Sequence, residues 1–165
     1  MSFIGRGAAG GLMRALAALS TVLILALTLV TCVDVVGRYW FNAPLPGAFE
    51  LTELMLGALV FAALPLTTRD GGHVEVDLVG MLMGARGGAV LTAFGNVFAA
   101  LVLAVFAWRL GVEALRLGED GSVTNALRLP MAPVAWFAAF ACLLSAAAAV
   151  ARAGAAMSHK ERLND

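Results

Sequence analysis

Asp34, Arg38, Glu50 and Glu53 are the residues of this chain whose types and spacing best predict a chemical interaction. Asp34 precedes Arg38 by four residues, which is the favourable order for an ion pair along one face of a helix. Arg38 can instead reach Glu50 or Glu53, which follow after a proline-containing turn. An unpaired charge beside apolar surroundings is costly, so this pattern predicts ion pairing, with the partner of Arg38 left open among the three acids.

Catalytic and cofactor chemistry find no matching set of residues in the sequence. The two histidines, His73 and His159, lie outside the apolar stretches and are poorly placed to hold a haem between membrane helices. Cys32 and Cys142 have no partner at metal-ligand spacing. We therefore expect no enzyme activity, no catalytic or substrate-binding residue, no metal and no cofactor. The formal net charge of zero argues against nucleic acid as a partner.

The uncharged stretches of the sequence predict the helices that position these charged residues. With 61% apolar and 13% charged residues, the chain of 165 residues is too apolar for a soluble domain. All charges lie outside four windows, which are residues 15–33, 54–68, 87–108 and 129–151. About 20 helical residues cross the hydrocarbon core of a bilayer. We predict an all-α integral membrane protein, a single four-helix domain over 1–165, with transmembrane helices at about 12–36, 47–68, 87–108 and 129–151.

The distribution of Lys and Arg predicts how the helices are oriented. Seven basic residues lie on the side of the two termini and the middle loop, against four on the other side. By the positive-inside bias, we expect both termini in the cytoplasm, including the tail at 153–165. The first apolar stretch is longer than that of a signal peptide, so we expect it to remain as a span.

Two loops carry signals of their own. A start of the second helix at Gly47 places Glu50 and Glu53 in its first turns, near the positive end of the helix dipole. In the middle loop, residues 69–86, apolar positions at helical spacing predict either a short interfacial helix or an extension of the third membrane helix.

Small residues predict where the membrane helices pack. Gly88, Thr92 and Asn96 recur every four residues along the third helix and, with Ala100 and Ala104, form a narrow ridge. The fourth helix carries two similar lines, Ala138, Cys142 and Ala146, and Ala141, Ser145 and Ala149. An interhelical hydrogen bond is the expected role of the Asn96 amide, and a part in transport is the alternative.

The hairpin from Asp34 to Glu53 has two interpretations. Tyr39, Trp40 and Phe41 follow the end of the first helix, where an aromatic belt at the membrane surface is expected. A helix end with such a belt and an ion pair explains most of the pattern. A docking surface for another protein is the alternative.

Three phrases resemble a known family in order along the chain. They are Gly37-Arg38-Tyr39-Trp40-Phe41-Asn42 with Leu45-Pro46, Glu50-Leu51 and Glu53-Leu54; then Gly72-His73-Val74-Glu75-Val76-Asp77; then Leu129-Pro130 with Trp136. Over roughly residues 12–152, the chain resembles the DctQ-like small membrane subunit of tripartite ATP-independent periplasmic (TRAP) transporters. Trp40 departs from the family pattern, which often has a smaller apolar residue there.

This resemblance implies a role as scaffold in the bacterial inner membrane. In such systems a periplasmic binding protein delivers an organic acid to a large, sodium-coupled permease subunit, beside which the small subunit packs. The residues that the resemblance implies to shape the outer hairpin or to contact partners are Arg38, Tyr39, Asn42, Pro46, Glu50 and Glu53. We expect the same of Asp34, from its spacing to Arg38, and of Pro130, at the opening of the last helix. His73 and Asp77 are implied to do the same on the cytoplasmic side. The alternatives are an accessory subunit of another carboxylate transporter and a stand-alone small homo-oligomeric transporter.

Overall fold

Four long helices make up the computed structural model, which describes residues 8–70 and 77–162. They are α1 (Ala8–Trp40), α2 (Ala48–Asp70), α3 (Asp77–Glu119) and α4 (Ala132–Arg162). Each contains a stretch that is long and apolar enough to cross a membrane. The all-α membrane class with four spans, predicted from the sequence, is confirmed.

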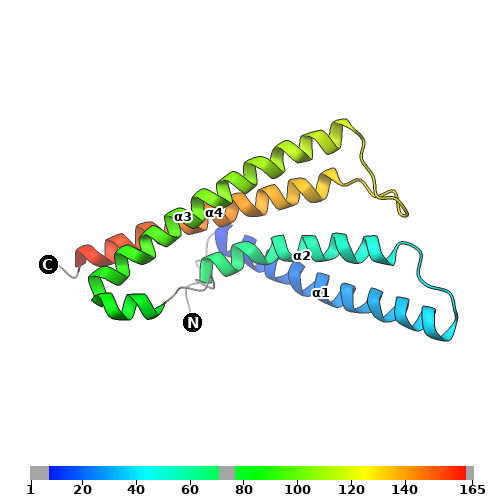
Figure 1. Cartoon of the computed structure of the whole chain (residues 1–165), viewed down its shortest axis with the longest axis horizontal. Helices are drawn as coiled ribbons and strands as arrows, with labels where there is room; N and C mark the ends of the chain where they lie inside the picture. Colours follow the sequence, from blue (N-terminus) through cyan, green and yellow to red (C-terminus); the bar gives the residue numbers. More distant parts are fainter. Residues whose placement is uncertain (1–7, 71–76, 163–165) are drawn as a thin grey trace.

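Each helix continues past the predicted end of its span, whereas α2 and α4 begin one and three residues after their predicted starts. α3 has 43 residues, so at 1.5 Å per residue it is about 65 Å long, roughly twice the thickness of a hydrocarbon core. Its first turns, from Asp77, come from the middle loop and are continuous with the membrane helix, as the second alternative for that loop expected. Figure 1 shows these turns lying at an angle to the rest of α3.

The helices form a single layer. α1 packs against α2, α2 against α4, and α4 against α3, and no other pair of helices is in contact within the described residues. Figure 1 shows this order, α3, α4, α2, α1, from top to bottom. The two helical hairpins, α1–α2 and α3–α4, spread apart towards their loops. The arrangement is therefore two antiparallel hairpins joined through α2 and α4.

The buried centre of this layer lies along α4. In its apolar stretch 39% of the residues are buried, against 11% in that of α1. The α4 residues that are buried are small, and they include both predicted lines: Ala138, Ala139, Ala141, Cys142, Ser145, Ala146, Ala149 and Ala153. Small side chains let helix backbones approach closely, which is how helices associate where lipid replaces water.

The accessible surface is large for the mass of the chain. It measures 11421 Å², whereas a compact soluble monomer of 17.0 kDa exposes about 7,700 Å². Exposed large apolar side chains occur along the spans of α1 and α3, among them Leu25, Leu29, Phe94, Phe98 and Leu101. Such a surface is stable only against lipid or another apolar protein surface.

Candidate functional site

The two interhelical loops at one end of the layer hold most of the residues singled out in the sequence. The α1–α2 loop comprises residues 41–47, and the α3–α4 loop comprises residues 120–131. Both loops lie at the same end of the molecule, opposite the end where α2 finishes and α3 begins (Figure 1).

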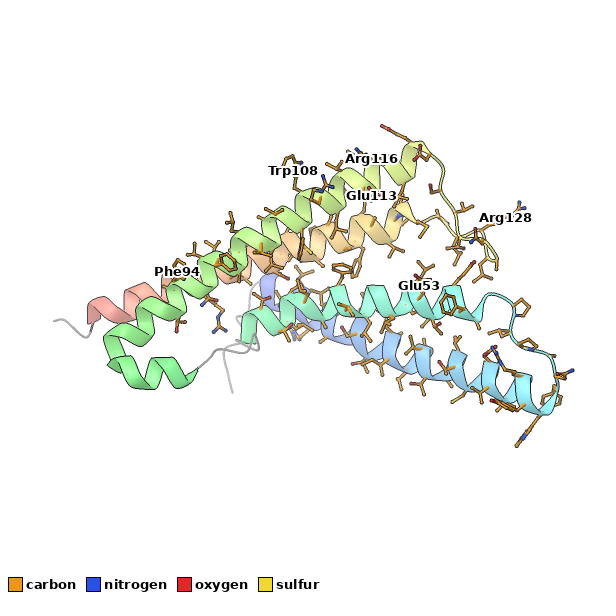
Figure 2. The ribbon with its side chains drawn as sticks, viewed as in Figure 1. Glu53, Phe94, Trp108, Glu113, Arg116 and Arg128 are labelled. Atoms are coloured by element: carbon orange, nitrogen blue, oxygen red, sulfur yellow. The ribbon has the colours of Figure 1, made fainter. Side chains whose placement is uncertain are left out.

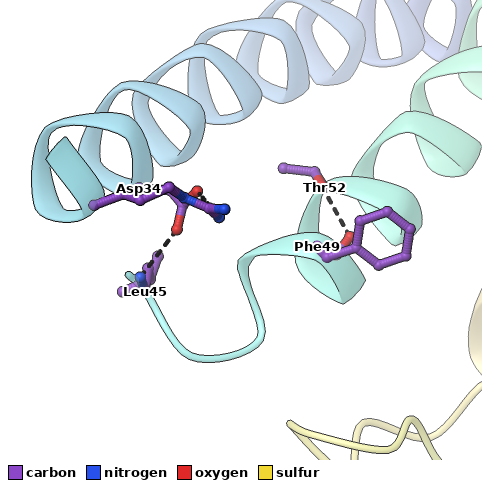
Figure 3. A network of polar contacts seen from close by, with 5 residues as sticks. Asp34, Leu45, Phe49 and Thr52 are labelled. Atoms are coloured by element: carbon purple, nitrogen blue, oxygen red, sulfur yellow. Dashed lines mark hydrogen bonds and ion pairs between the residues drawn. The ribbon is translucent and has the colours of Figure 1, made fainter. Parts of the chain in front are cut away.

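Asp34 organises the α1–α2 loop from the last turns of α1. Its Oδ2 pairs with Arg38 Nη2 at 2.8 Å. Of the three acids predicted as possible partners of Arg38, the partner is therefore Asp34, which lies on the same helix. Its Oδ1 accepts a hydrogen bond from the backbone N–H of Leu45 at 3.0 Å. Figure 3 shows the Asp34 side chain reaching across to Leu45. One carboxylate therefore neutralises Arg38 and closes the loop.

Backbone contacts make the same loop tight. The Gly37 carbonyl accepts hydrogen bonds from the N–H groups of Phe41 at 3.2 Å and Ala43 at 2.9 Å. A Cβ atom on Gly37 would lie 2.7 Å from the carbonyl oxygen of Ala43, so only glycine fits there. Asn42 has a φ of 50°, a left-handed conformation that asparagine tolerates better than most residues.

Glu50 connects the two loops. From the first turn of α2, its Oε1 accepts a hydrogen bond from the N–H of Ala126 at 2.7 Å, and its Oε2 accepts one from the N–H of Leu127 at 3.1 Å. Beside it, Gly47 has a φ of 74°, and a Cβ atom there would lie 2.5 Å from Leu127 Cγ. The tip of the α3–α4 loop thus rests against the beginning of α2.

The α3–α4 loop is closed by its own backbone. Val123 and Pro130 form an isolated antiparallel bridge, Thr124 N–H donates to Leu129 O at 3.0 Å, and Met131 N–H donates to Ser122 O at 3.2 Å. The Thr124 Oγ1 also accepts a hydrogen bond from Leu129 N–H at 3.0 Å. Pro130 belongs to this bridge and precedes α4, which begins at Ala132, so the predicted start of the fourth helix at 129 is too early.

The remaining residues expected near this end are exposed and lie around the loops. Tyr39, Trp40 and Phe41 are 72–81% exposed at the end of α1. Asn42 and Pro46 are exposed in the loop, and Glu53 is exposed on α2 one turn after Glu50. Arg128, which the sequence did not single out, is exposed with a φ of 51°.

The other predicted residues lie away from this end or outside the described part of the chain. His73 lies outside the described residues, and Asp77 and Gly88 fall in the part of α3 whose side chains are not described. Thr92 and Asn96 are half-buried, and Asn96 Nδ2 donates to the Thr92 carbonyl at 2.8 Å, a bond within α3 and not between helices. The buried face of α3 runs through Ala93, Ala100, Leu103 and Ala114.

Sequence reasoning missed the contact between Glu50 and the α3–α4 loop. The partners of Glu50 are backbone N–H groups 76 and 77 residues further along, and a backbone group carries no signature in the sequence. Gly47 gave a weak signal, because a glycine between a proline and a helix start is typical of a left-handed turn.

The chemistry available at this end is recognition and positioning. Within residues 8–70 and 77–162, no group of three or more His, Cys, Asp or Glu side chains is placed to hold a metal ion. The carboxylates of Asp34 and Glu50 are engaged with Arg38 and with backbone N–H groups. The two loops therefore form one surface, which these two carboxylates hold in place.

Comparison with known families decides what kind of protein carries this surface. Residues 27–158 match the family of tripartite ATP-independent periplasmic transporters, DctQ component. The chain belongs to this family. No curated protein and no solved structure matches it. As a DctQ subunit, the chain is the small permease subunit of a TRAP transporter, a multi-pass inner-membrane protein and a transporter component, not an enzyme.

Proposed function

We propose that this DctQ subunit is a scaffold for a larger, sodium-coupled permease subunit, which takes up an organic acid delivered by a periplasmic binding protein. The observation that supports this most is that the apolar windows carry no charge and expose large apolar side chains. All charges lie outside the four apolar windows, while large apolar side chains cover the exposed surface of α1 and α3. Ionisable groups inside membrane spans commonly mark ion and substrate pathways, and the uncharged windows of this chain support substrate and sodium sites in the partner.

The same proposal includes an orientation. With seven basic residues on the side of the termini and the middle loop and four on the other, both termini lie in the cytoplasm. The α1–α2 and α3–α4 loops then face the periplasm, where the binding protein arrives. A phosphatase that is active only in the periplasm can be fused to the carboxyl terminus. We expect this fusion to be inactive, because the terminus lies in the cytoplasm, and an active fusion would contradict the orientation.

The loop end offers the contacts for these partners. Arg38, Tyr39, Asn42, Pro46 and Glu53 are exposed around the α1–α2 loop and available to a partner protein. Pro130 is exposed in the bridge of the α3–α4 loop. On the cytoplasmic side, His73 and Asp77 are proposed to contact the large subunit.

Co-purification and uptake test the scaffold role. A tagged form of this subunit is expected to purify with a much larger polytopic membrane protein encoded beside it. Deleting the small subunit while the large one is still made is expected to abolish uptake, and restoring the full chain is expected to rescue it. Normal uptake of the organic acid without this subunit would contradict the proposal.

A further inference from the structure

The α3–α4 loop is attached to the α1–α2 hairpin at one described point near the loop end. Both oxygens of Glu50 accept backbone hydrogen bonds there, from Ala126 at 2.7 Å and Leu127 at 3.1 Å. The Leu127 side chain fills the space where a side chain on Gly47 would stand. The contact is specific, since it needs an acid of this length and a glycine three residues before it.

The next buried residues of α2 lie far from this contact. Among the described helices, only α2 and α4 join the two hairpins. On α2, Ala48 is buried beside the loop contact, and the next buried residues, Ala62, Pro65 and Thr68, lie in the other half of the helix. The hairpins spread apart towards the loops in Figure 1, and the α3–α4 loop turns back towards the beginning of α2. The position of this loop therefore depends on Glu50.

The residue that this contact positions is Arg128. It follows the two amides held by Glu50, and its φ of 51° is a left-handed conformation that is disfavoured for a residue with a Cβ atom. Such strain persists where the surroundings enforce it and is concentrated at functional positions. Figure 2 shows the Arg128 side chain at the tip of the loop, pointing away from the four helices.

We propose that Glu50 is a positioning residue, which holds the α3–α4 loop so that Arg128 binds a surface carboxylate of the substrate-binding protein. A guanidinium in a fixed place pairs with a carboxylate through two parallel hydrogen bonds, and this pairing is sensitive to orientation. The inference rests on the proposed function, because it needs the loops to face the periplasm and a binding protein to dock there. A phosphate of a lipid headgroup is the other anion that Arg128 can meet.

A double-mutant cycle on the assembled transporter tests this inference. The complex of this subunit with its large permease subunit is placed in nanodiscs of uncharged lipid, and the dissociation constant of the substrate-binding protein is measured per assembled complex. We expect Glu50→Ala and Arg128→Ala each to weaken docking by roughly tenfold. Since Glu50 acts through Arg128, the double variant is expected to lose about the same tenfold and not the product of the two effects.

Matched controls separate positioning from general charge and from folding. Glu113→Ala and Arg116→Ala remove exposed charges from the loop end of α3 and are expected to leave docking unchanged (Figure 2). Arg128→Lys keeps the charge and is expected to restore part of the affinity. Should Glu50→Ala not assemble with the large subunit, Glu50→Gln takes its place, because its amide keeps one acceptor of the two.

Three results would overturn the inference. They are unchanged docking by the assembled Glu50 variant, unchanged docking by Arg128→Ala, as expected if Arg128 meets lipid, and a double variant weakened by roughly a hundredfold, which is the product of independent effects. If the unaltered chain assembles with no large subunit or its complex binds no substrate-binding protein, the proposed function fails and this inference with it. If the unaltered complex assembles and docks normally, a negative result with the variants contradicts only the role of Glu50 and leaves the proposed function standing.

Discussion

The two hairpins of this subunit are held together in different ways. In the α3–α4 hairpin, small residues of α4 are buried along its length, and the loop is closed by a backbone bridge between Val123 and Pro130. In the α1–α2 hairpin, only 11% of each apolar stretch is buried, and the loop is closed by the side chain of Asp34 and the absence of a side chain at Gly37.

This difference predicts at which positions a substitution lowers the stability of the molecule. A helix packed through small residues tolerates no added volume over its whole contact, because protein interiors leave few voids. A hairpin that exposes its apolar side chains tolerates substitutions along its surface and depends on a few residues at its loop. We therefore expect sensitivity to be spread along α4 and concentrated at the end of the α1–α2 hairpin.

The largest effect is expected from added volume in α4. Ala149 is fully buried, so Ala149→Leu should lower the stability of the purified subunit by about 1–3 kcal/mol through overpacking. Thermal unfolding followed by circular dichroism measures this. Ala18→Leu makes the same change on the exposed surface of α1 and should stay within about 0.5 kcal/mol. Equal effects of the two substitutions would break the contrast between the hairpins.

An intermediate effect on stability is expected at Gly47, which lies against Leu127 of the α3–α4 loop. Gly47→Ala places a Cβ atom against Leu127 in a left-handed conformation and should cost about 1–2 kcal/mol from the backbone alone. Gly57→Ala is the control, because Gly57 lies within α2 with no heavy atom within 4 Å of the added Cβ. It should raise the melting temperature, since alanine favours a helix over glycine. A Gly47 variant as stable as this control would contradict the contact.

The smallest effect is expected within the α1–α2 loop and separates the two roles of Asp34. Asp34→Ala removes the acceptor of the Leu45 N–H, so hydrogen exchange at this amide should become faster. Arg38→Ala leaves this hydrogen bond in place and should change the exchange much less. Mass spectrometry of the peptide that contains Leu45 measures the exchange, with Glu113→Ala as an unaffected reference. Equal acceleration in the Asp34 and Arg38 variants would show that the ion pair, not the carboxylate alone, closes the loop.

Much of the fold was predictable because charges decide where a chain can cross a membrane. The four apolar windows predicted the four spans, and the helices of the structure contain nearly all of each window. The ends of the helices were less predictable. α3 continues through charged residues such as Arg109 and Glu113 up to Glu119, because a helix beyond the bilayer satisfies its own backbone whatever its side chains.

The candidate site was predictable only in part. The spacing of Asp34 and Arg38 predicted the ion pair among its alternatives, because residues four apart on a helix are neighbours wherever the helix lies. The spacing of Thr92 and Asn96 predicted a packing ridge, yet both are half-buried and the buried residue beside them is Ala93. A helix face is set by its partner, and α3 has only α4 as a described neighbour.

Apolar length, charge placement and short motifs are local properties of the chain, so the class of this protein, its four spans and its family follow from the sequence. The contact between α2 and α4 and the hydrogen bonds of Glu50 with the amides of Ala126 and Leu127 became known from the folded structure alone. The physical reason is that these contacts link backbone groups and small side chains far apart in the chain. Their residue types carry no mark of the partner that folding brings to them.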